Sequence, residues 1–253
     1  MELIHALPLF GVGLLAGFIN VMAGGGSMLT VPAMILLGMP GPVANGTNRI
    51  AILFQNFVAV ITFFRKGFAD FKQSLKLLLC ALPGTVCGAW VGAELEGAWF
   101  NRTLAIIMCG ALLLTWMKGK KKNEPEIEED GEPISGRRKL FGYMLMIGIG
   151  FYGGFIQIGV SLILMPLLNR VFKMDLVRVN MHKVFIICGY SFVALAIFAW
   201  RVDIQWGLGI ALAAGAGVGG FIGASLSIRH GEKWIRTLLQ IILVLFVVKL
   251  LFF

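Results

Sequence analysis

Charged residues are scarce in this chain, since Asp, Glu, Lys and Arg make up only 14% of its 253 residues. A soluble globular domain carries about 25%, so the shortage argues against a soluble protein. Apolar residues make up 58%, and they are gathered in runs of the length that lies in lipid. The composition therefore predicts an integral membrane protein.

Motifs of metal, redox and nucleotide chemistry are also missing. None of the four cysteines belongs to a CxxC pair or has a histidine at metal-ligand spacing, so we expect no metal and no cofactor. No Walker-type phosphate loop is present, which argues against a nucleotide-driven pump within this chain. Glu2 stands where a cleaved signal peptide carries basic residues, so we interpret the first apolar run as a retained helix.

The charge that is present is mostly positive, with a formal net charge of +9. In a soluble protein this excess would suggest a nucleic-acid partner. Here the basic residues gather in loops between apolar runs, where they orient the chain and meet anionic lipid. We therefore expect the lipid bilayer, and no nucleic acid, as the partner of this charge.

Apolar runs divide the chain into two similar halves. The runs lie near 3–22, 27–39, 44–64, 73–94 and 101–117, and then near 140–157, 159–169, 180–200, 205–227 and 234–253. The stretch between them has blocks of both charge signs and two prolines, which is typical of a solvated linker. We expect a first membrane repeat at 1–117, a cytoplasmic charged linker at 118–139 and a second membrane repeat at 140–253.

Residues 134 positions apart support a diverged duplication of the kind that transporters carry. The first half has Gly25, Ser27, Pro32 and Arg49, and the second half has Gly159, Ser161, Pro166 and Lys183. Identity elsewhere is low.

Loop charge predicts that the two repeats are inverted. The loops after 44–64 and after 159–169 are strongly basic, as is the linker. If all of them lie in the cytoplasm, each half crosses the membrane an odd number of times and both termini are periplasmic. The run at 27–39 has about thirteen residues, fewer than the ~17–25 of a full span, so we expect a short or re-entrant helix there. The predicted fold is an all-α membrane protein with two inverted repeats of about five helical segments each, broken at the glycine-rich motifs.

A run of three glycines interrupts the first apolar pair at AGGGS, residues 23–27. Irregular backbone persists at membrane depth only where protein or a watery cavity covers it, so the break should lie inside the bundle. We expect Ser27 to be the N-cap of the next helix, whose free amides would form an anion site. The alternative is that the glycines only permit close helix packing, which is also our interpretation of AAGAGVGGFIGA at 213–224.

Polar residues accompany the break on the helix after GMPGPVANGTNR, residues 38–49. We expect Asn45, Thr47 and Asn48 to supply donors and caps at the start of this helix. The polar stripe that continues to Gln55 and Asn56 should turn inward, and the repeat supplies a matching set on the second-half helix. The candidate substrate-binding residues are Gly24, Gly25, Gly26, Ser27, Asn45, Thr47, Asn48, Arg49, Gln55, Gln157, Ser161, Asn180, His182 and Lys183. Tyr190 and Ser191 extend the second stripe.

Structural roles, as alternatives to substrate binding, stay open for the charged candidates. Arg49 and Lys183 could snorkel to an interface, and His182 could be a satisfied buried imidazole. Glu94, Glu96 and Asp203, near the expected membrane edges, are candidate proton sites.

The chain resembles the sulfite exporter TauE/SafE family of bacterial membrane transporters, through GFINVMAGGGSMLTVP (residues 17–32) followed by GMPGPVANGTNR. Its GFYGGFIQIGVSLILMP (residues 150–166) is similar to the second-half motif of that family. The resemblance implies transport of a small sulfur-containing oxyanion, such as sulfite, sulfoacetate or another organosulfonate, across the bacterial inner membrane.

We therefore predict a secondary transporter that works by alternating access, and no enzyme. The partners would be a small anionic substrate and the bilayer, and a homo-oligomer is compatible with the sequence. The alternatives are an anion channel of the same architecture, an intramembrane enzyme, and a membrane sensor without flux.

Overall fold

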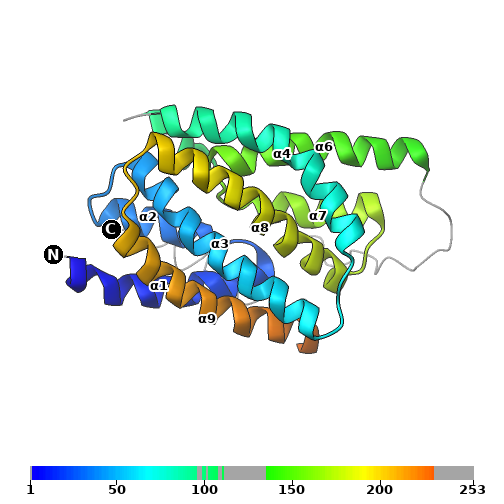
Figure 1. The fold of residues 1–253 in the computed structure, drawn as a ribbon, viewed down its shortest axis with the longest axis horizontal. Coiled ribbons are helices and arrows are strands. Elements are labelled where there is room, and N and C mark those ends of the chain that lie inside the picture. Colours follow the sequence, from blue (N-terminus) through cyan, green and yellow to red (C-terminus); the bar gives the residue numbers. More distant parts are fainter. Residues whose placement is uncertain (1, 96–98, 101, 108–109, 111–134, 231–253) are drawn as a thin grey trace.

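The computed structural model describes residues 2–95, 99–100, 102–107, 110 and 135–230. Every regular element among these residues is an α-helix. The first half contains α1 (Glu2–Ala23), α2 (Ser27–Leu36), α3 (Gly41–Arg65) and α4 (Phe71–Glu94), and the second contains α6 (Gly136–Phe155), α7 (Val160–Phe172), α8 (Leu176–Arg201) and α9 (Trp206–His230) (Figure 1). The expected segment at 234–253 and most of the expected linker lie outside the described residues.

Four of these helices, α3, α4, α8 and α9, are long and apolar enough to cross a membrane. This confirms the all-α membrane protein that the composition predicts. Three of the four begin at a recognisable signal: Pro42 lies in the first turn of α3. Asp70 caps α4 by accepting from the Gln73 amide at 3.0 Å, and Asp175 caps α8 by accepting from the Val177 and Arg178 amides, each at 2.9 Å.

The second and seventh helices are too short to span lipid. α2 has ten residues, which is about 15 Å at 1.5 Å per residue, and α7 has thirteen residues. The hydrocarbon core of a bilayer is about 30 Å thick, so the short helix expected at 27–39 is confirmed. Each short helix follows a longer one across a break, as a hairpin of α1 with α2 and another of α6 with α7.

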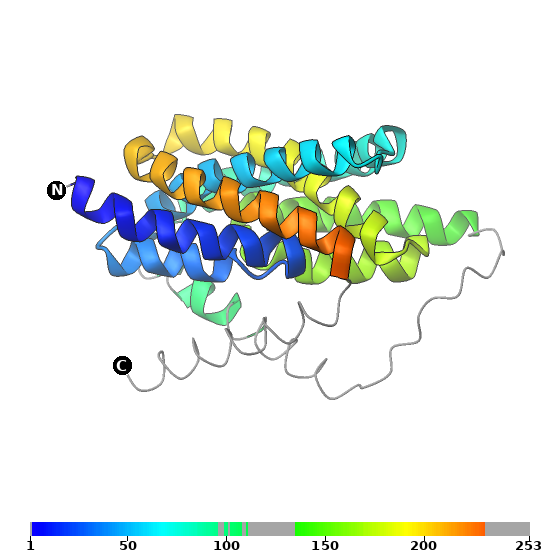
Figure 2. The ribbon, with the colours of Figure 1, turned by 90° about the horizontal axis from the view of Figure 1, so that it is seen from below.

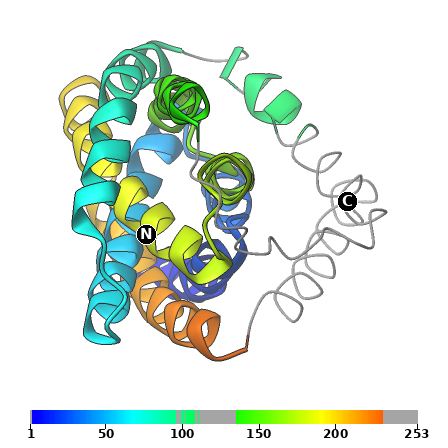
Figure 3. The ribbon, with the colours of Figure 1, turned by 90° about the vertical axis from the view of Figure 1, so that its right-hand side faces the viewer.

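Glycines bring helices of different halves into direct backbone contact. A Cβ atom added at Gly17 of α1 would meet the Ala216 carbonyl of α9, and one at Gly88 of α4 would meet the Phe151 carbonyl of α6. Small residues allow such close approach in membranes, and Gly215 and Gly219 confirm the close-packing interpretation of residues 213–224. Figures 2 and 3 show α1 beside α9 and α4 beside α6, so each half packs mainly on the other.

Basic residues gather at one end of the bundle, which is on the right of Figure 1. This end holds the α3–α4 loop with Lys66, the start of α6 with Arg137 and Arg138, and the α7–α8 loop with Lys173. The α2–α3 and α8–α9 loops lie at the opposite end. The fold thus separates basic loops from the others, as the loop charges require.

Candidate functional site

The two breaks in the chain touch each other inside the bundle. Ser27 of α2 donates from its hydroxyl to the Gln157 carbonyl at 3.4 Å and accepts from the Gly159 amide at 3.2 Å. Gly24 has a φ of 89°, and a Cβ atom there would collide with the Ser161 side chain. Both breaks are buried, as expected for irregular backbone in a membrane protein.

The expected N-cap role of Ser27 is wrong. Gly26 holds the N-cap position of α2 in helical geometry and without a side-chain cap. The Ser27 hydroxyl instead bonds to the other break, because that break leaves a carbonyl and an amide unpaired in a dry interior. The expectation of caps at Asn45, Thr47 and Asn48 is also wrong, since α3 already begins at Gly41.

Arg49 is fully buried, with 0% of its surface exposed, so it does not snorkel. Its guanidinium donates to the Gly153 carbonyl at 3.2 Å, to the Phe155 carbonyl at 3.4 Å and to the Gly154 carbonyl. The last carbonyls of a helix have no partner within it and carry the negative end of its dipole. Arg49 of α3 therefore caps the carboxyl end of α6.

Three side chains complete the surroundings of this guanidinium. Gln157 accepts from Arg49 at 3.0 Å and donates to the Ser191 hydroxyl at 2.7 Å. The guanidinium carbon lies 4.2 Å from the centre of the Phe198 ring, a cation–π contact. The site thus joins α3 with the α6–α7 break and with α8.

Lys183 repeats this arrangement in the second half. It is also 0% exposed, which excludes snorkelling, and its ammonium donates to the Val21 carbonyl at 2.6 Å and to the Asn20 carbonyl at 3.3 Å. These are among the last carbonyls of α1. Each cation therefore donates to the last carbonyls of a helix in the opposite half: Arg49 caps α6 and Lys183 caps α1. The sequence motifs do not reveal this exchange between the halves.

These buried cations have no buried carboxylate beside them. Arg49 and Lys183 are buried, whereas no Asp or Glu is buried among the residues whose side chains the structure describes. The acidic residues with ion pairs lie toward the surface, where Asp175 meets Arg178 and Glu94 meets Arg201. Because buried charges are normally paired, the interior has positive charge that a bound anion could balance.

Several buried polar atoms near Arg49 have no hydrogen-bond partner. They are the side-chain oxygen of Asn45, both amide atoms of Asn48, the Nε of Arg49 and the hydroxyl of Tyr190. The Asn45 nitrogen does have one, the Phe155 carbonyl at 2.9 Å, and the Tyr190 hydroxyl lies against Gly153. Such orphaned groups are uncommon and cost about 1–3 kcal/mol each. We call Asn45, Arg49, Gln157, Tyr190 and Ser191 the Arg49 cluster.

Four other candidates lie away from the two breaks. Thr47 accepts from the Gln205 amide at 3.1 Å, Gln55 lies against Gly220 of α9, and Asn180 donates to Ser227 at 2.6 Å. His182 pairs with Ser74 of α4 at 2.7 Å, as a satisfied buried imidazole would. The structure thus brings together Gly24, Ser27, Ser161, Asn45, Arg49 and Gln157 where the two breaks meet. It places Lys183 at the end of α1 and these four between packed helices.

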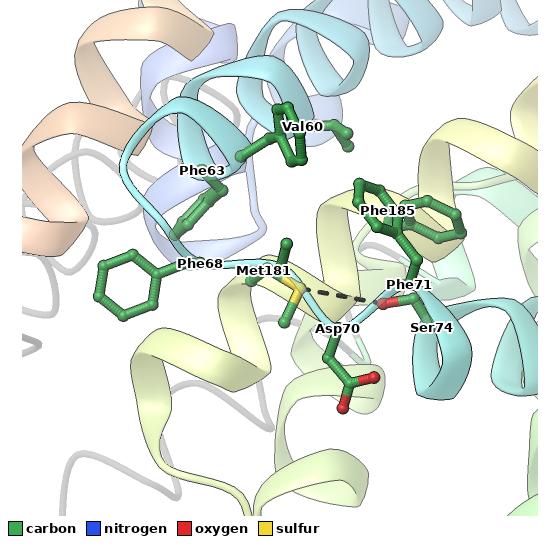
Figure 4. Close-up of a pocket in the computed structure, with 10 residues that line it drawn as sticks. Val60, Phe63, Phe68, Asp70, Phe71, Ser74, Met181 and Phe185 are labelled. Carbon is green, nitrogen blue, oxygen red and sulfur yellow. Dashed lines mark hydrogen bonds between the residues drawn. The ribbon is translucent and has the colours of Figure 1, made fainter.

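A small hollow lies at the basic end of the bundle, between the α3–α4 loop and α8 (Figure 4). Its walls are mostly aromatic and aliphatic, and its carboxylate, Asp70, is the N-cap of α4. Apolar walls beside a carboxylate do not suit an anion, so we assign no substrate site there.

Known proteins resemble this chain along almost its whole length. The family model described as "Sulfite exporter TauE/SafE" matches residues 9–250. The "Probable membrane transporter protein ORF9" of Sinorhizobium sp is 27% identical over 96% of this chain and 91% of its own length. A "Probable membrane transporter protein" of Haemophilus influenzae is 25% identical over 96% and 93%, and "Probable membrane transporter protein YfcA" of Escherichia coli K12 is 25% identical over 96% and 88%. No solved structure gives a significant match.

Proposed function

The chain belongs to the sulfite exporter TauE/SafE family, and from this premise we propose that it is a secondary transporter for a small sulfur-containing oxyanion. The family and the relatives make it a membrane transporter. The substrate class, the site and alternating access in the bacterial inner membrane are our proposal. The observation that carries it is the pair of buried cations without a buried carboxylate in the described residues.

Charge favours an oxyanion at the Arg49 cluster. A unit anion 4 Å from a cation gains about 4 kcal/mol at an effective dielectric constant of 20. A guanidinium presents donors in a planar fork that matches two oxygens of one oxyanion. The orphaned donors of Tyr190 and of Arg49 Nε could take further oxygens of a sulfite or sulfonate group.

Binding would also loosen the contact between the halves. In this conformation the α6 carbonyls accept from both terminal nitrogens of Arg49. An anion that takes over one of these donors releases part of the α6 end, next to the α6–α7 break. This competition gives a physical route from substrate binding to movement of the broken helices, as alternating access requires.

Matched packing supports two inverted repeats. α1 packs on α9 as α6 packs on α4, and α3 packs on α9 as α8 packs on α4. Figure 1 shows α1 and α6 running in opposite directions along the bundle. We propose that the basic end is cytoplasmic, together with the linker at 118–139.

Cysteine labelling tests the orientation. In a chain whose native cysteines are replaced by alanine, Lys66→Cys and Lys173→Cys should react with an impermeant maleimide only from the cytoplasmic side. Leu37→Cys, at the opposite end, should react from outside. Labelling of Lys66→Cys and Leu37→Cys from the same side would contradict the proposed orientation.

Counterflow in liposomes tests the function. The wild-type protein should exchange labelled sulfite or sulfoacetate for unlabelled anion with saturation. Arg49→Lys keeps the charge but loses the fork, so apparent affinity should fall about 10- to 100-fold, the equivalent of a charged hydrogen bond of about 1.5–3 kcal/mol. Arg65→Lys, exposed on the same helix, is the control.

Each outcome separates the alternatives. Flux that neither saturates nor shows counterflow would indicate an anion channel. Unchanged affinity in Arg49→Lys would remove Arg49 from the binding site. Folded wild-type protein that exchanges neither anion would refute the proposed substrate class.

A further inference from the structure

Arg49 and Lys183 occupy matching places but differ in one chemical property. A guanidinium stays protonated in proteins, whereas a lysine ammonium can release its proton when it is buried. Both side chains are fully buried, and both close the carboxyl end of a broken helix. The two halves therefore hold one permanent cation and one cation that can become neutral.

The surroundings of Lys183 contain no charge that would fix its state. Its ammonium contacts the carbonyls of Asn20 and Val21 and the sulfur of Met165 at 3.9 Å, and among the described residues the ion pairs of Asp175 and Glu94 involve other partners. Residues 6–22 of α1 and 206–227 of α9 include no charged residue. The neighbouring His182 turns to Ser74 of α4.

Charged and titratable side chains on the other helices packed against α8 are engaged elsewhere. Arg49 lies at the α6 end, Tyr152 donates to the Ile158 carbonyl and Tyr143 accepts from Gln73. The exposed ones are Arg65, Lys72, Lys76, Arg137, Arg138, Lys139 and Arg170. Of the carboxylates proposed from sequence as proton sites, Glu94 is exposed beside Arg201 and Asp203 is exposed, while Glu96 lies outside the described residues.

We propose that Lys183 carries the coupling proton, so that the protein co-transports one proton with a divalent oxyanion that Arg49 holds. This rests on the proposed function. With the dianion bound, protonated Lys183 and Arg49 balance its two charges. After the anion leaves, Lys183 gives its proton to water and becomes a neutral amine, which removes one unpaired charge from the interior.

The position of Lys183 links this proton to movement. Val21, whose carbonyl it holds, lies three residues before Gly24, where the backbone has a φ of 89°. Hydrogen bonds from a charged donor are about twice as strong as neutral ones, so loss of the proton weakens the hold on the α1 end. The α1–α2 hairpin is then freer to move at its glycine break.

Proton uptake in liposomes tests this proposal. Vesicles with a pH dye inside receive an inward gradient of sulfoacetate at equal pH, with potassium and valinomycin to remove the membrane potential. Sulfoacetate is fully ionised near neutral pH, so it brings no proton of its own. The wild-type protein should acidify the interior in proportion to anion uptake. Counterflow of labelled sulfoacetate is measured on the same vesicles.

Two substitutions at Lys183 and one control are compared. Lys183→Arg fixes the positive charge and Lys183→Met removes it, so at least one of them should keep counterflow, and neither should show coupled acidification. Lys76→Met, at an exposed lysine of α4, should behave as wild type in both measurements.

The outcomes keep the two proposals apart. Wild-type counterflow without acidification, or with alkalinisation, would refute proton co-transport and leave the transporter standing. Acidification that persists in both Lys183 variants would also refute it. If both variants fold but lose counterflow, Lys183 is an anion-binding or structural residue and the proposal is wrong. Absence of wild-type counterflow with both sulfite and sulfoacetate would refute the proposed function itself.

Discussion

The contact between the two breaks predicts a specific cost for one added methyl group. Gly24→Ala puts a Cβ atom where the Ser161 side chain lies, at a φ of 89°. Left-handed backbone costs an alanine about 1–2 kcal/mol. Overpacking a filled site costs about 1–3 kcal/mol more, so the free energy of unfolding should fall by about 2–5 kcal/mol in total.

Gly38 provides a matched control for the backbone term. It has the same φ of 89°, lies in the α2–α3 loop, and has nothing within 4 Å of an added Cβ atom. Gly38→Ala should therefore lose only the backbone part, about 1–2 kcal/mol. Reversible unfolding in mixed detergent micelles, followed by circular dichroism, would measure both variants.

A rescuing substitution makes the prediction sharper. Ser161→Gly removes the atoms that the new methyl group would meet. The free energy of unfolding of the double variant Gly24→Ala/Ser161→Gly should therefore exceed the value expected from adding the two single effects by about 1–3 kcal/mol. Equal losses for Gly24→Ala and Gly38→Ala, or additive effects in the double variant, would refute the close contact of the two breaks.

Two further substitutions test the helix contacts with the same unfolding assay. Arg49→Met leaves the α6 carbonyls without their donor and should lower the free energy of unfolding by about 1–3 kcal/mol, whereas Arg65→Met, at an exposed position, should change it by no more than about 0.5 kcal/mol; equal effects would contradict the capping role. Gly88→Leu should prevent α4 from packing on α6, because the side chain would meet backbone atoms, while Gly148→Leu, with open space around it, should fold normally. A stable Gly88→Leu protein would show that this helix contact is loose.

Hydrophobic pattern was enough to predict the helices. The runs at 44–64 and 180–200 became α3 (Gly41–Arg65) and α8 (Leu176–Arg201), because lipid requires long apolar segments whose backbone groups bond within the helix. The motif-based resemblance to the TauE/SafE family is confirmed by the family model. The burial of the polar stripes was also predictable, since polar groups avoid lipid.

The partners of the buried groups could not be predicted in the same way. Arg49 and Lys183 bond to backbone carbonyls, and every residue has a carbonyl, so no side-chain pattern marks the acceptor. Ser27 is of the residue type that N-caps favour and stands directly before a helix, but its hydroxyl bonds to the carbonyl of Gln157 and the amide of Gly159 in the opposite break. His182 and Asn180 have polar side chains that suit a site, yet each finds a hydroxyl on a neighbouring helix. These outcomes depend on tertiary contacts between distant parts of the chain.

Each half supplies the side chain that caps a broken helix of the other half, so the two breaks depend on each other. Arg49 stands on the helix after the first break but holds α6, and Lys183 stands on the helix after the second break but holds α1. A shift of either hairpin therefore changes the surroundings of a cation in the other half, where an unpaired charge is costly. Two hairpins joined in this way favour joint movement over independent movement. In the proposed mechanism, the difference between arginine and lysine at the matched positions would let one half respond to the anion and the other to the proton.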